Sequence, residues 1–417
     1  MSKLIIQNGN MCELDLPLKF AQKLYNEFAI RHPNAFYLRT RQRGMQNWDG
    51  KIHYITKTGQ FKIGLLPKVY DMCIEMGIKP KVVDMRQPLP KVSKVVTNIG
   101  KYKLRPEQEK AVKSVINNRV GDTPFHIGVL DYTVNAGKTL IMSSLYLTYK
   151  KQLKTLLITN DSDWLNQARE EFKQYLPGED ITFVQGKVLN WSNFTIGMVQ
   201  SISRNMRFYQ KELSQIDMVL VDEADQGGSK QYQNVITRLF NTRIRIGLSG
   251  TIYMSKLAKD KVKNMNLECF FGKVIAEFKL KDSIKKGYST KTIVKMVPGK
   301  PWYGNWESDC ISYKEIYDDS ITENNTAWTM AYNRLRWNIN QGRYPALVVC
   351  KHIAHCENLY KFFKKKLGDA YNIAYVHVNT PSKLRQQIMR DFREGKIDIL
   401  VSTTIIARGK NFPKLRY

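Results

Sequence analysis

The stretch from Ile127 to Leu140 constrains the fold of this chain more than any other part of the sequence. An apolar run leads into a turn of small and polar residues, and Gly137-Lys138-Thr139 then opens a second apolar run. This order predicts a strand, a tight loop and the first turn of a helix. Backbone N–H groups of such a loop and the positive end of the helix dipole form a cradle for anions, so we expect a nucleoside triphosphate here. The residues expected around its phosphates are Asn135, Ala136, Gly137, Lys138 and Thr139.

Tyr132 stands where the phosphate-binding loop pattern has its first glycine. We therefore expect its side chain to crowd the loop and to weaken nucleotide binding. Taken alone, the stretch is also compatible with an ordinary strand-to-helix turn that carries a surface lysine. A second stretch of sequence decides between these two interpretations.

That second stretch is an acidic turn after an apolar run. Residues 218–221 are apolar, and Asp222-Glu223-Ala224-Asp225 follows them directly, as expected at the end of a neighbouring parallel strand. Asp222 is predicted to hold Mg²⁺ through water together with the Thr139 hydroxyl, and Glu223 to orient and deprotonate the attacking water. The order of the two stretches favours a nucleotide site whose catalytic residues are Lys138, Asp222 and Glu223.

Several further motifs occur in the order found in superfamily 2 helicases and translocases, and the sequence resembles that family. Residues 104–108 resemble the adenine-reading Q motif, residues 248–251 the Ser-X-Thr coupling motif, and residues 399–409 motif V of the second motor domain. The resemblance implies an α/β fold with two RecA-like parallel-sheet motor domains, ATP and Mg²⁺ as cofactors, and a nucleic acid as partner. ATP hydrolysis would then be coupled to unwinding.

The resemblance also implies roles for individual residues. Gln108 would hydrogen-bond adenine beside Arg105, and Gly409 would lie at the same nucleotide. Asp225, Ser249 and Thr251 would couple the nucleotide state to the grip on a strand. Ser201 and Thr403 are also compatible with ordinary strand-end hydroxyls. The implied nucleic-acid contacts of the two motor domains are Asn160, Gln200, Ser201, Lys351, His352, Thr403 and Arg408.

Within the superfamily, the sequence is most similar to phage branched-DNA helicases of the UvsW type. The likeness rests on residues 47–51, on Phe271-Gly272 and on residues 351–355. It implies remodelling of forks and junctions, including branch migration, in replication, recombination or repair. Two alternatives stay open: an RNA helicase, suggested by the wording of residues 222–225, and a nucleotide-switched nucleic-acid-binding or annealing module, suggested by Tyr132.

Three domains are expected. Residues 1–100 would form a small α+β DNA-binding accessory domain with a linker, residues 101–285 motor domain 1 with the ATP site, and residues 286–417 motor domain 2. No Gln-X-X-Gly-Arg-X-X-Arg segment, which in the family supplies an arginine finger, follows motif V before residue 417. We therefore expect motor domain 2 to be truncated at its C-terminus.

Basic and aromatic residues gather in the first of these domains. Arg39, Arg41 and Arg43 alternate, which predicts a row of cations on one face of a strand, next to Trp48. Such a face suits a phosphate backbone or stacked bases. A solvated strand face with Trp48 as a core anchor is an equal alternative.

The charge of the whole chain favours a polyanionic partner. Its 66 lysines and arginines against 37 acidic residues give a net charge of +29, which favours nucleic acid. Without an amphipathic anchor or lipidation motif, membrane lipid is the weaker alternative. No apolar run of membrane-spanning length and no signal peptide is found, so we expect a cytoplasmic protein, in the host cytoplasm if it is phage-encoded.

The cysteines suggest reduced, structural thiols. Six of them are scattered along the chain without CxxC spacing, as is typical of an intracellular protein. Residues 350–356 hold four potential zinc ligands, but an apparent buried strand runs straight into this segment, which argues against zinc.

Overall fold

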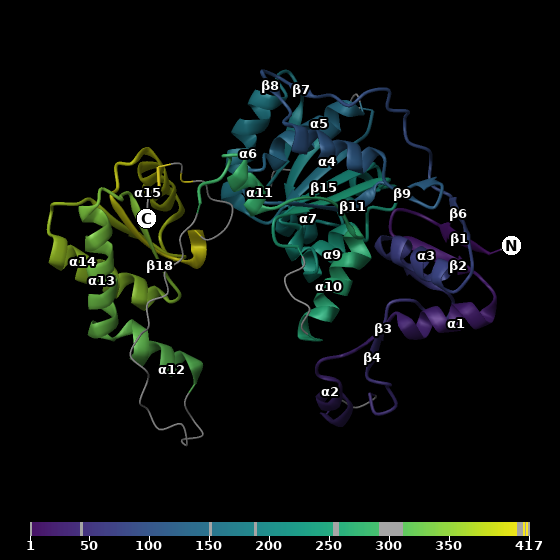
Figure 1. Cartoon of the computed structure of the whole chain (residues 1–417), viewed down its shortest axis with the longest axis horizontal. Helices are drawn as coiled ribbons and strands as arrows, with labels where there is room; N and C mark the ends of the chain where they lie inside the picture. Colours follow the sequence, from purple (N-terminus) through teal and green to yellow (C-terminus); the bar gives the residue numbers. More distant parts are fainter. Residues whose placement is uncertain are drawn as a thin grey trace. The chain divides into compact units, whose positions relative to one another are not determined.

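The computed structural model describes residues 2–41, 45–149, 152–186, 190–252, 258–291, 312–406, 412 and 414–415 (Figure 1). It divides into two compact units, Met1–Lys291 and Thr292–Tyr417. Residues 1–100 and 101–285 fall in the same unit, so the division into three domains stays a prediction. No helix of the described residues is long and apolar enough to cross a membrane.

A seven-stranded sheet, parallel throughout, is the centre of the first unit. Its strands are mostly continuous apolar runs because both faces of the sheet are covered. The strands, in spatial order, are β13 (Ile181–Val184), β14 (Phe194–Met198), β12 (Thr155–Thr159), β15 (Met218–Asp222), β16 (Ile244–Ser249), β11 (Ile127–Tyr132) and β17 (Val274–Phe278).

Alternate residues of each strand enter different cores. Met218 and Leu220 belong to one apolar cluster, and Val219 and Val221 to the other. Figure 1 shows α4 and α5 on one side of the sheet and α9 and α10 on the other. The helices of this part are α4 (Pro106–Ile116), α5 (Lys138–Thr148), α6 (Ser162–Tyr175), α7 (Val199–Arg204), α8 (Gln210–Ser214), α9 (Lys230–Ile236), α10 (Ala258–Phe271) and α11 (Leu280–Lys285), with the 3₁₀ turn η2 (Ala224–Gln226).

The N-terminal region contributes a second, mixed sheet of four strands in the order β5-β2-β1-β6. Its buried residues belong to the same apolar cluster as one face of the seven-stranded sheet. Further small pairs are β3–β4, β7–β8 and β9–β10. The elements of this region and of the connection to β11 are β1 (Lys3–Ile6), β2 (Met11–Asp15), α1 (Leu18–Glu27), β3 (Ala29–Arg31), α2 (Ala35–Arg41), β4 (Lys51–His53), β5 (Gln60–Lys62), η1 (Ile63–Leu65), α3 (Leu66–Glu75), β6 (Lys81–Asp84), β7 (Asn98–Ile99), β8 (Tyr102–Lys103), β9 (Arg119–Val120) and β10 (Thr123–Pro124).

A buried arginine joins the two sheets. Arg245 of β16 is fully buried, and its Nη2 donates hydrogen bonds to the Gly9 carbonyl (2.6 Å) and to Asn10 Oδ1 (2.7 Å). Its Nη1 donates to the Phe270 carbonyl at the end of α10 (3.1 Å). The N-terminal sheet is therefore anchored in the interior of the first unit.

The second unit holds a three-stranded parallel sheet in the order β18-β20-β19. Two apolar clusters again lie on its faces. The parallel-sheet α/β architecture predicted for both motor domains is confirmed. The elements are α12 (Tyr313–Tyr317), η3 (Asp318–Thr322), α13 (Asn325–Asn340), β18 (Ala346–Cys350), α14 (Ile353–Leu367), β19 (Ile373–Val376), α15 (Ser382–Glu394), β20 (Ile399–Thr403) and η4 (Thr404–Ile406).

Candidate nucleotide site and nucleic-acid contacts

The loop between β11 and α5 has the backbone that a phosphate cradle needs. Gly137 lies at the N-cap of α5 with φ +76°, and Asn135 has φ +63°. Such angles strain most residues, and a Cβ at Gly137 would overlap Gln108 Nε2. Lys138 and Thr139 therefore begin the helix directly after a left-handed turn, with the helix N-terminus open to an anion.

The acidic turn lies beside this loop. Lys138 Nζ is 3.8 Å from Asp222 Oδ1 and 3.9 Å from Glu223 Oε1. Asp222 ends β15, and Glu223 follows it with φ +52°. The structure thus brings together the three residues that the sequence predicted to be catalytic.

Asp222 is a buried carboxylate. It is 2% exposed, and its Oδ1 accepts no hydrogen bond from the described residues. Burial raises the pKa of Asp222, and the Lys138 ammonium opposes that rise. A buried carboxylate oxygen without a hydrogen bond, next to the first turn of α5, fits a hard divalent cation such as Mg²⁺.

Gln108 is held against the phosphate loop. Its Nε2 donates to the Ala136 carbonyl (2.9 Å), and its Oε1 accepts from the Arg105 backbone N–H (2.8 Å). Arg105 Nη2 donates to the Asn135 carbonyl (3.1 Å). Both residues therefore support the loop, and their contact with adenine stays a prediction.

The expectation that Tyr132 crowds the phosphate loop is wrong. The Tyr132 side chain is fully buried, and its hydroxyl donates to the Glu107 carbonyl (2.8 Å). Its ring lies 6.0 Å from that of Phe278. The side chain leaves the strand toward the core under α4, so the absence of the first glycine does not fill the nucleotide site.

The residues predicted to couple the two functions are neighbours. Ser249 ends β16, and its hydroxyl donates to Asp225 Oδ1 (3.3 Å) and accepts from the Thr251 backbone N–H (3.1 Å). This chain of contacts runs from the acidic turn to the end of the adjacent strand. It is suited to transmit a change at the nucleotide, and that role stays a prediction.

Three predicted nucleic-acid contacts gather at the ends of β12 and β14. Gln200 Nε2 donates to the Asn160 carbonyl (3.2 Å), and Asn160 Nδ2 donates to Gln226 Oε1 (3.0 Å). The Ser201 hydroxyl accepts from the Gly186 N–H (3.0 Å), which is a structural contact. Gln226 was not among the predicted contacts, although its place directly after residues 222–225 is a usable signal.

The arginine-rich part of the N-terminal region is a helix, so the predicted strand is wrong. Arg39 and Arg41 lie on α2, where residues two apart point to nearly opposite sides, and the Arg41 guanidinium lies 5.1 Å from the centre of the Tyr37 ring. Arg43 lies outside the described residues. A pocket of about 550 Å³ beside α2 is lined by Arg39 together with Arg31, Phe36, Lys51 and five other residues.

Trp48 takes a different part in this region. It is half-buried, its Nε1 donates to the Lys51 carbonyl (2.9 Å), and its ring meets His32 edge-on at 5.7 Å. The ring therefore braces the turn before β4. Its contact with nucleic acid stays a prediction.

In the second unit, the predicted contacts lie at adjacent strand ends. Lys351 follows β18 and its Nζ lies 4.1 Å from the centre of the Tyr313 ring, and His352 meets Tyr317 edge-on at 4.6 Å. Thr403 ends β20 and pairs in register with Cys350. Arg408 and Gly409 lie outside the described residues.

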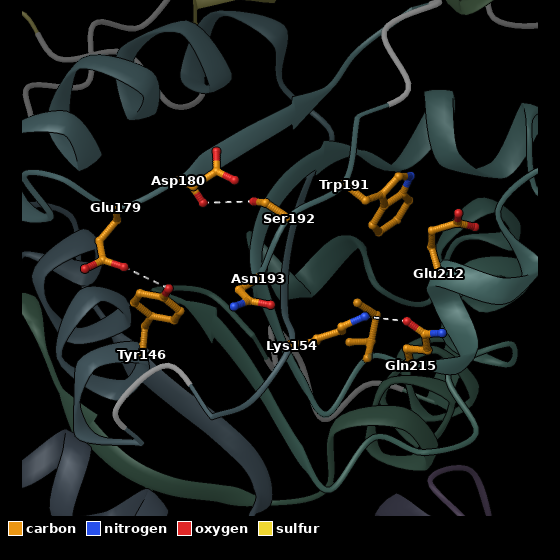
Figure 2. Close-up of a pocket in the computed structure, with 10 residues that line it drawn as sticks. Tyr146, Lys154, Glu179, Asp180, Trp191, Ser192, Asn193, Glu212 and Gln215 are labelled. Atoms are coloured by element: carbon orange, nitrogen blue, oxygen red, sulfur yellow. Dashed lines mark hydrogen bonds between the residues drawn. The ribbon is translucent and has the colours of Figure 1, made fainter.

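Another pocket of the first unit is distinct from the nucleotide site. It has a volume of about 340 Å³ and is lined by Tyr146, Lys154, Trp191, Glu212 and six other residues (Figure 2). Lys154 precedes β12, whereas Lys138 and Asp222 lie after β11 and at the end of β15. In a parallel sheet the amino ends and the carboxyl ends of the strands lie on opposite sides. The pocket lies at the amino ends and the nucleotide site at the carboxyl ends, so this pocket does not receive the nucleotide.

The fold and the site together define a class. A phosphate-binding loop and an acidic strand end at the carboxyl edge of a parallel sheet, followed by a second parallel sheet, are the features of tandem RecA-like P-loop domains. Two family models match the chain in the same order: "Type III restriction enzyme, res subunit" over residues 101–254 and "Helicase conserved C-terminal domain" over residues 331–417. Together they cover more than half of the chain. The chain belongs to the superfamily 2 helicases.

Curated relatives and solved structures agree with this assignment. The chain is 23% identical to the ATP-dependent RNA helicase CHR1 of Candida albicans over 48% of its length, and 22% identical to the competence protein ComFA of Bacillus subtilis over 67%. It spans 29% and 54% of the length of these two relatives. Two structures of UvsW from bacteriophage T4 share the fold: one with 22% identity and a TM-score of 0.51 over 67% of this chain and 99% of that chain, the other with 19% and 0.52 over 99% and 82%.

Proposed function

We propose that this chain is an ATP-driven motor that remodels branched DNA. The observation that carries the proposal is the cluster at the phosphate loop, where Lys138 Nζ lies within 4 Å of both Asp222 and Glu223. A lysine between a phosphate loop and two acidic groups can neutralise phosphate charge while one carboxylate positions water.

Each residue of the cluster has a separate task in the proposed reaction. The loop N–H groups and Lys138 bind the β- and γ-phosphates. Thr139 and Asp222 would hold Mg²⁺, which would neutralise part of the phosphate charge when it is bound. Glu223 accepts a proton from the water that attacks the γ-phosphorus. Asp225, Ser249 and Thr251 pass the change at the γ-phosphate to the neighbouring strand ends.

Branched DNA is favoured as the substrate by the extent of one likeness. The fold shared with T4 UvsW covers 99% of this chain and so includes the N-terminal region. That region carries Arg31, Arg39 and Lys51 around one pocket, with Phe36 80% exposed beside them. Cations and an exposed ring on one surface suit phosphates and unstacked bases. A role in replication, recombination or repair belongs to the same proposal, as does a cytoplasmic location.

An RNA helicase is the second candidate. It is supported by the match to CHR1, whose name states that it is an RNA helicase, and by the wording of residues 222–225. This match covers 48% of the chain, so about half of the chain is not part of it.

The test uses labelled forked duplexes of one sequence, made of DNA or of RNA, at one fixed salt concentration. We expect ATP-dependent strand separation or branch migration of the DNA fork at a rate at least about tenfold above that of the RNA fork. The salt concentration is held fixed because the affinity for either nucleic acid depends on it. A faster reaction on RNA would support the second candidate. Annealing that proceeds equally without ATP would contradict a motor of either kind.

A further inference from the structure

Tyr288 covers one face of the Arg105 guanidinium, next to the phosphate loop. The Arg105 Cζ atom lies 4.1 Å from the centre of the Tyr288 ring, a distance at which a cation and an aromatic ring attract each other. Two further groups hold the edge of the same guanidinium. Its Nη2 donates to the Asn135 carbonyl (3.1 Å), and its Nε lies 3.2 Å from Glu107 Oε1.

Tyr288 is itself held by its surroundings. It follows α11, its backbone N–H donates to the Ser283 carbonyl (2.9 Å), and its ring lies 6.4 Å from that of Phe278. Two residues earlier, Lys286 Nζ lies 2.7 Å from Glu107 Oε2. The tyrosine is thus brought to the nucleotide site by the last helix of the first unit, far in sequence from the phosphate loop.

The guanidinium keeps a second face. The Arg105 side chain is 27% exposed, and no other aromatic ring in the described part of the chain lies over its guanidinium. A planar cation that is fixed at its edge and on one face can stack a planar partner on the other. A Cβ at Gly137 would lie 3.4 Å from Arg105 Nη2, so the guanidinium lies close to the start of α5.

We propose that Tyr288 is a positioning residue for the base of the bound nucleotide: it holds the Arg105 guanidinium flat so that the opposite face stacks on the base. The inference rests on the proposed nucleotide site. Without Tyr288, Arg105 keeps its polar contacts but regains freedom about its long side chain, and ordering that side chain again opposes base binding. Because Arg105 keeps its contact with the Asn135 carbonyl, the phosphate loop keeps its support and the binding of the phosphates should change little.

The test compares two ligands that differ in the base. Titration calorimetry on the whole chain measures the Kd of Mg²⁺ with a non-hydrolysable ATP analogue and of Mg²⁺ with tripolyphosphate, which has no base. Tyr288→Leu removes the ring, and Tyr288→Phe keeps it. The matched control is Phe183→Leu, since the Arg169 guanidinium lies 4.4 Å from the Phe183 ring in a similar stack on β13, at the far edge of the sheet.

We expect Tyr288→Leu to raise the Kd of the ATP analogue about fivefold or more and to change that of tripolyphosphate less than twofold. Tyr288→Phe and Phe183→Leu should both stay within twofold of the unaltered chain for both ligands. Equal weakening of both ligands by Tyr288→Leu, or of neither, would overturn the role of Tyr288. An unaltered chain that binds neither ligand would overturn the proposed function itself, and the inference with it.

Discussion

The environment of Asp222 disfavours the charged form of its carboxyl group. The carboxylate is buried, and its pKa is raised by that burial even though Lys138 is near. A carboxyl group whose pKa is higher in the folded than in the unfolded chain lowers stability at pH values above its unfolded pKa, and this penalty disappears as the pH falls to that value. A buried carboxyl group of this kind lowers stability, and the proposed Mg²⁺ site is a reason for its presence here.

Asp222→Asn should therefore stabilise the chain in the absence of nucleotide. We expect a gain of about 1 kcal/mol at pH 7, since the amide is much cheaper to bury than the carboxylate. Thermal unfolding at several pH values measures it, and the gain should shrink as the pH falls. A variant that is less stable than the unaltered chain at pH 7 would contradict this account of the site.

Tyr132 is the residue at which the sequence pattern was most misleading. We expect Tyr132→Gly, which restores the motif glycine, to destabilise the first unit by about 3–5 kcal/mol because it empties a filled core position. Tyr132→Phe should lose about 1 kcal/mol, through the hydrogen bond to the Glu107 carbonyl alone. Urea unfolding and nucleotide titration check both variants. Tighter nucleotide binding by Tyr132→Gly would restore the interpretation that the tyrosine crowds the loop.

At the scale of elements, the buried parts of the fold were predictable from the sequence. The strands near residues 127, 155, 195 and 218 are apolar on both faces, and that pattern admits few other structures. The segment around Arg39 was not predictable in the same way. Alternating arginines fit a strand pattern, but α2 is a short helix whose side chains are largely exposed. In such a segment few side chains are packed, so the sequence pattern does little to select helix or strand.

The site follows the same division. Lys138, Asp222 and Glu223 could be identified because local motifs place the lysine at the start of the helix after β11 and the two acids at the end of β15. Gln226 could have been identified from its place directly after residues 222–225, but Tyr288 could not, since it reaches Arg105 only through a tertiary contact. The direction of the Tyr132 side chain also depends on packing, because the hole that it fills is formed by α4 and β17.

Gly9, in the turn before β2, packs closely against the backbone of residues 239–242, which precede β16. A Cβ at Gly9 would lie 2.6 to 2.8 Å from three carbonyl oxygens, those of Leu239, Phe240 and Thr242. Gly9→Ala should therefore destabilise the first unit by about 1–3 kcal/mol, since backbone atoms must move.

The matched control for Gly9→Ala is Gly228→Ala. The nearest atom to a Cβ at Gly228 is Leu267 Cδ2 at 3.7 Å, an ordinary contact distance. This variant should change stability by less than about 0.5 kcal/mol. Unfolding followed separately in the N-terminal region and in the seven-stranded sheet would show one transition in both variants. A Gly9→Ala chain in which only the N-terminal region unfolds would contradict the shared core.

At the scale of the whole molecule, a net charge of +29 governs the encounter with nucleic acid. We expect the affinity for a DNA fork to fall at least about tenfold between 50 and 200 mM salt, because phosphate contacts release counterions. Arg39→Ala should reduce the slope of the logarithm of the affinity against the logarithm of the salt concentration by about 1, the value for one phosphate contact. Lys364→Ala, which removes a cation paired with Asp369 at 2.8 Å in the second unit, should leave it unchanged. Equal slopes for both variants would remove α2 from the nucleic-acid surface.

The central claim is that the cluster at the phosphate loop hydrolyses ATP in response to nucleic acid. The most direct measurement is the steady-state rate of ATP hydrolysis with no nucleic acid, single-stranded DNA, duplex DNA and a DNA fork, for the unaltered chain and for Glu223→Gln. We predict the highest rate with the fork and a loss of about 10² or more in the variant, which keeps the shape of Glu223 but cannot accept a proton. A rate that is the same with every DNA, or that Glu223→Gln leaves unchanged, would contradict the claim.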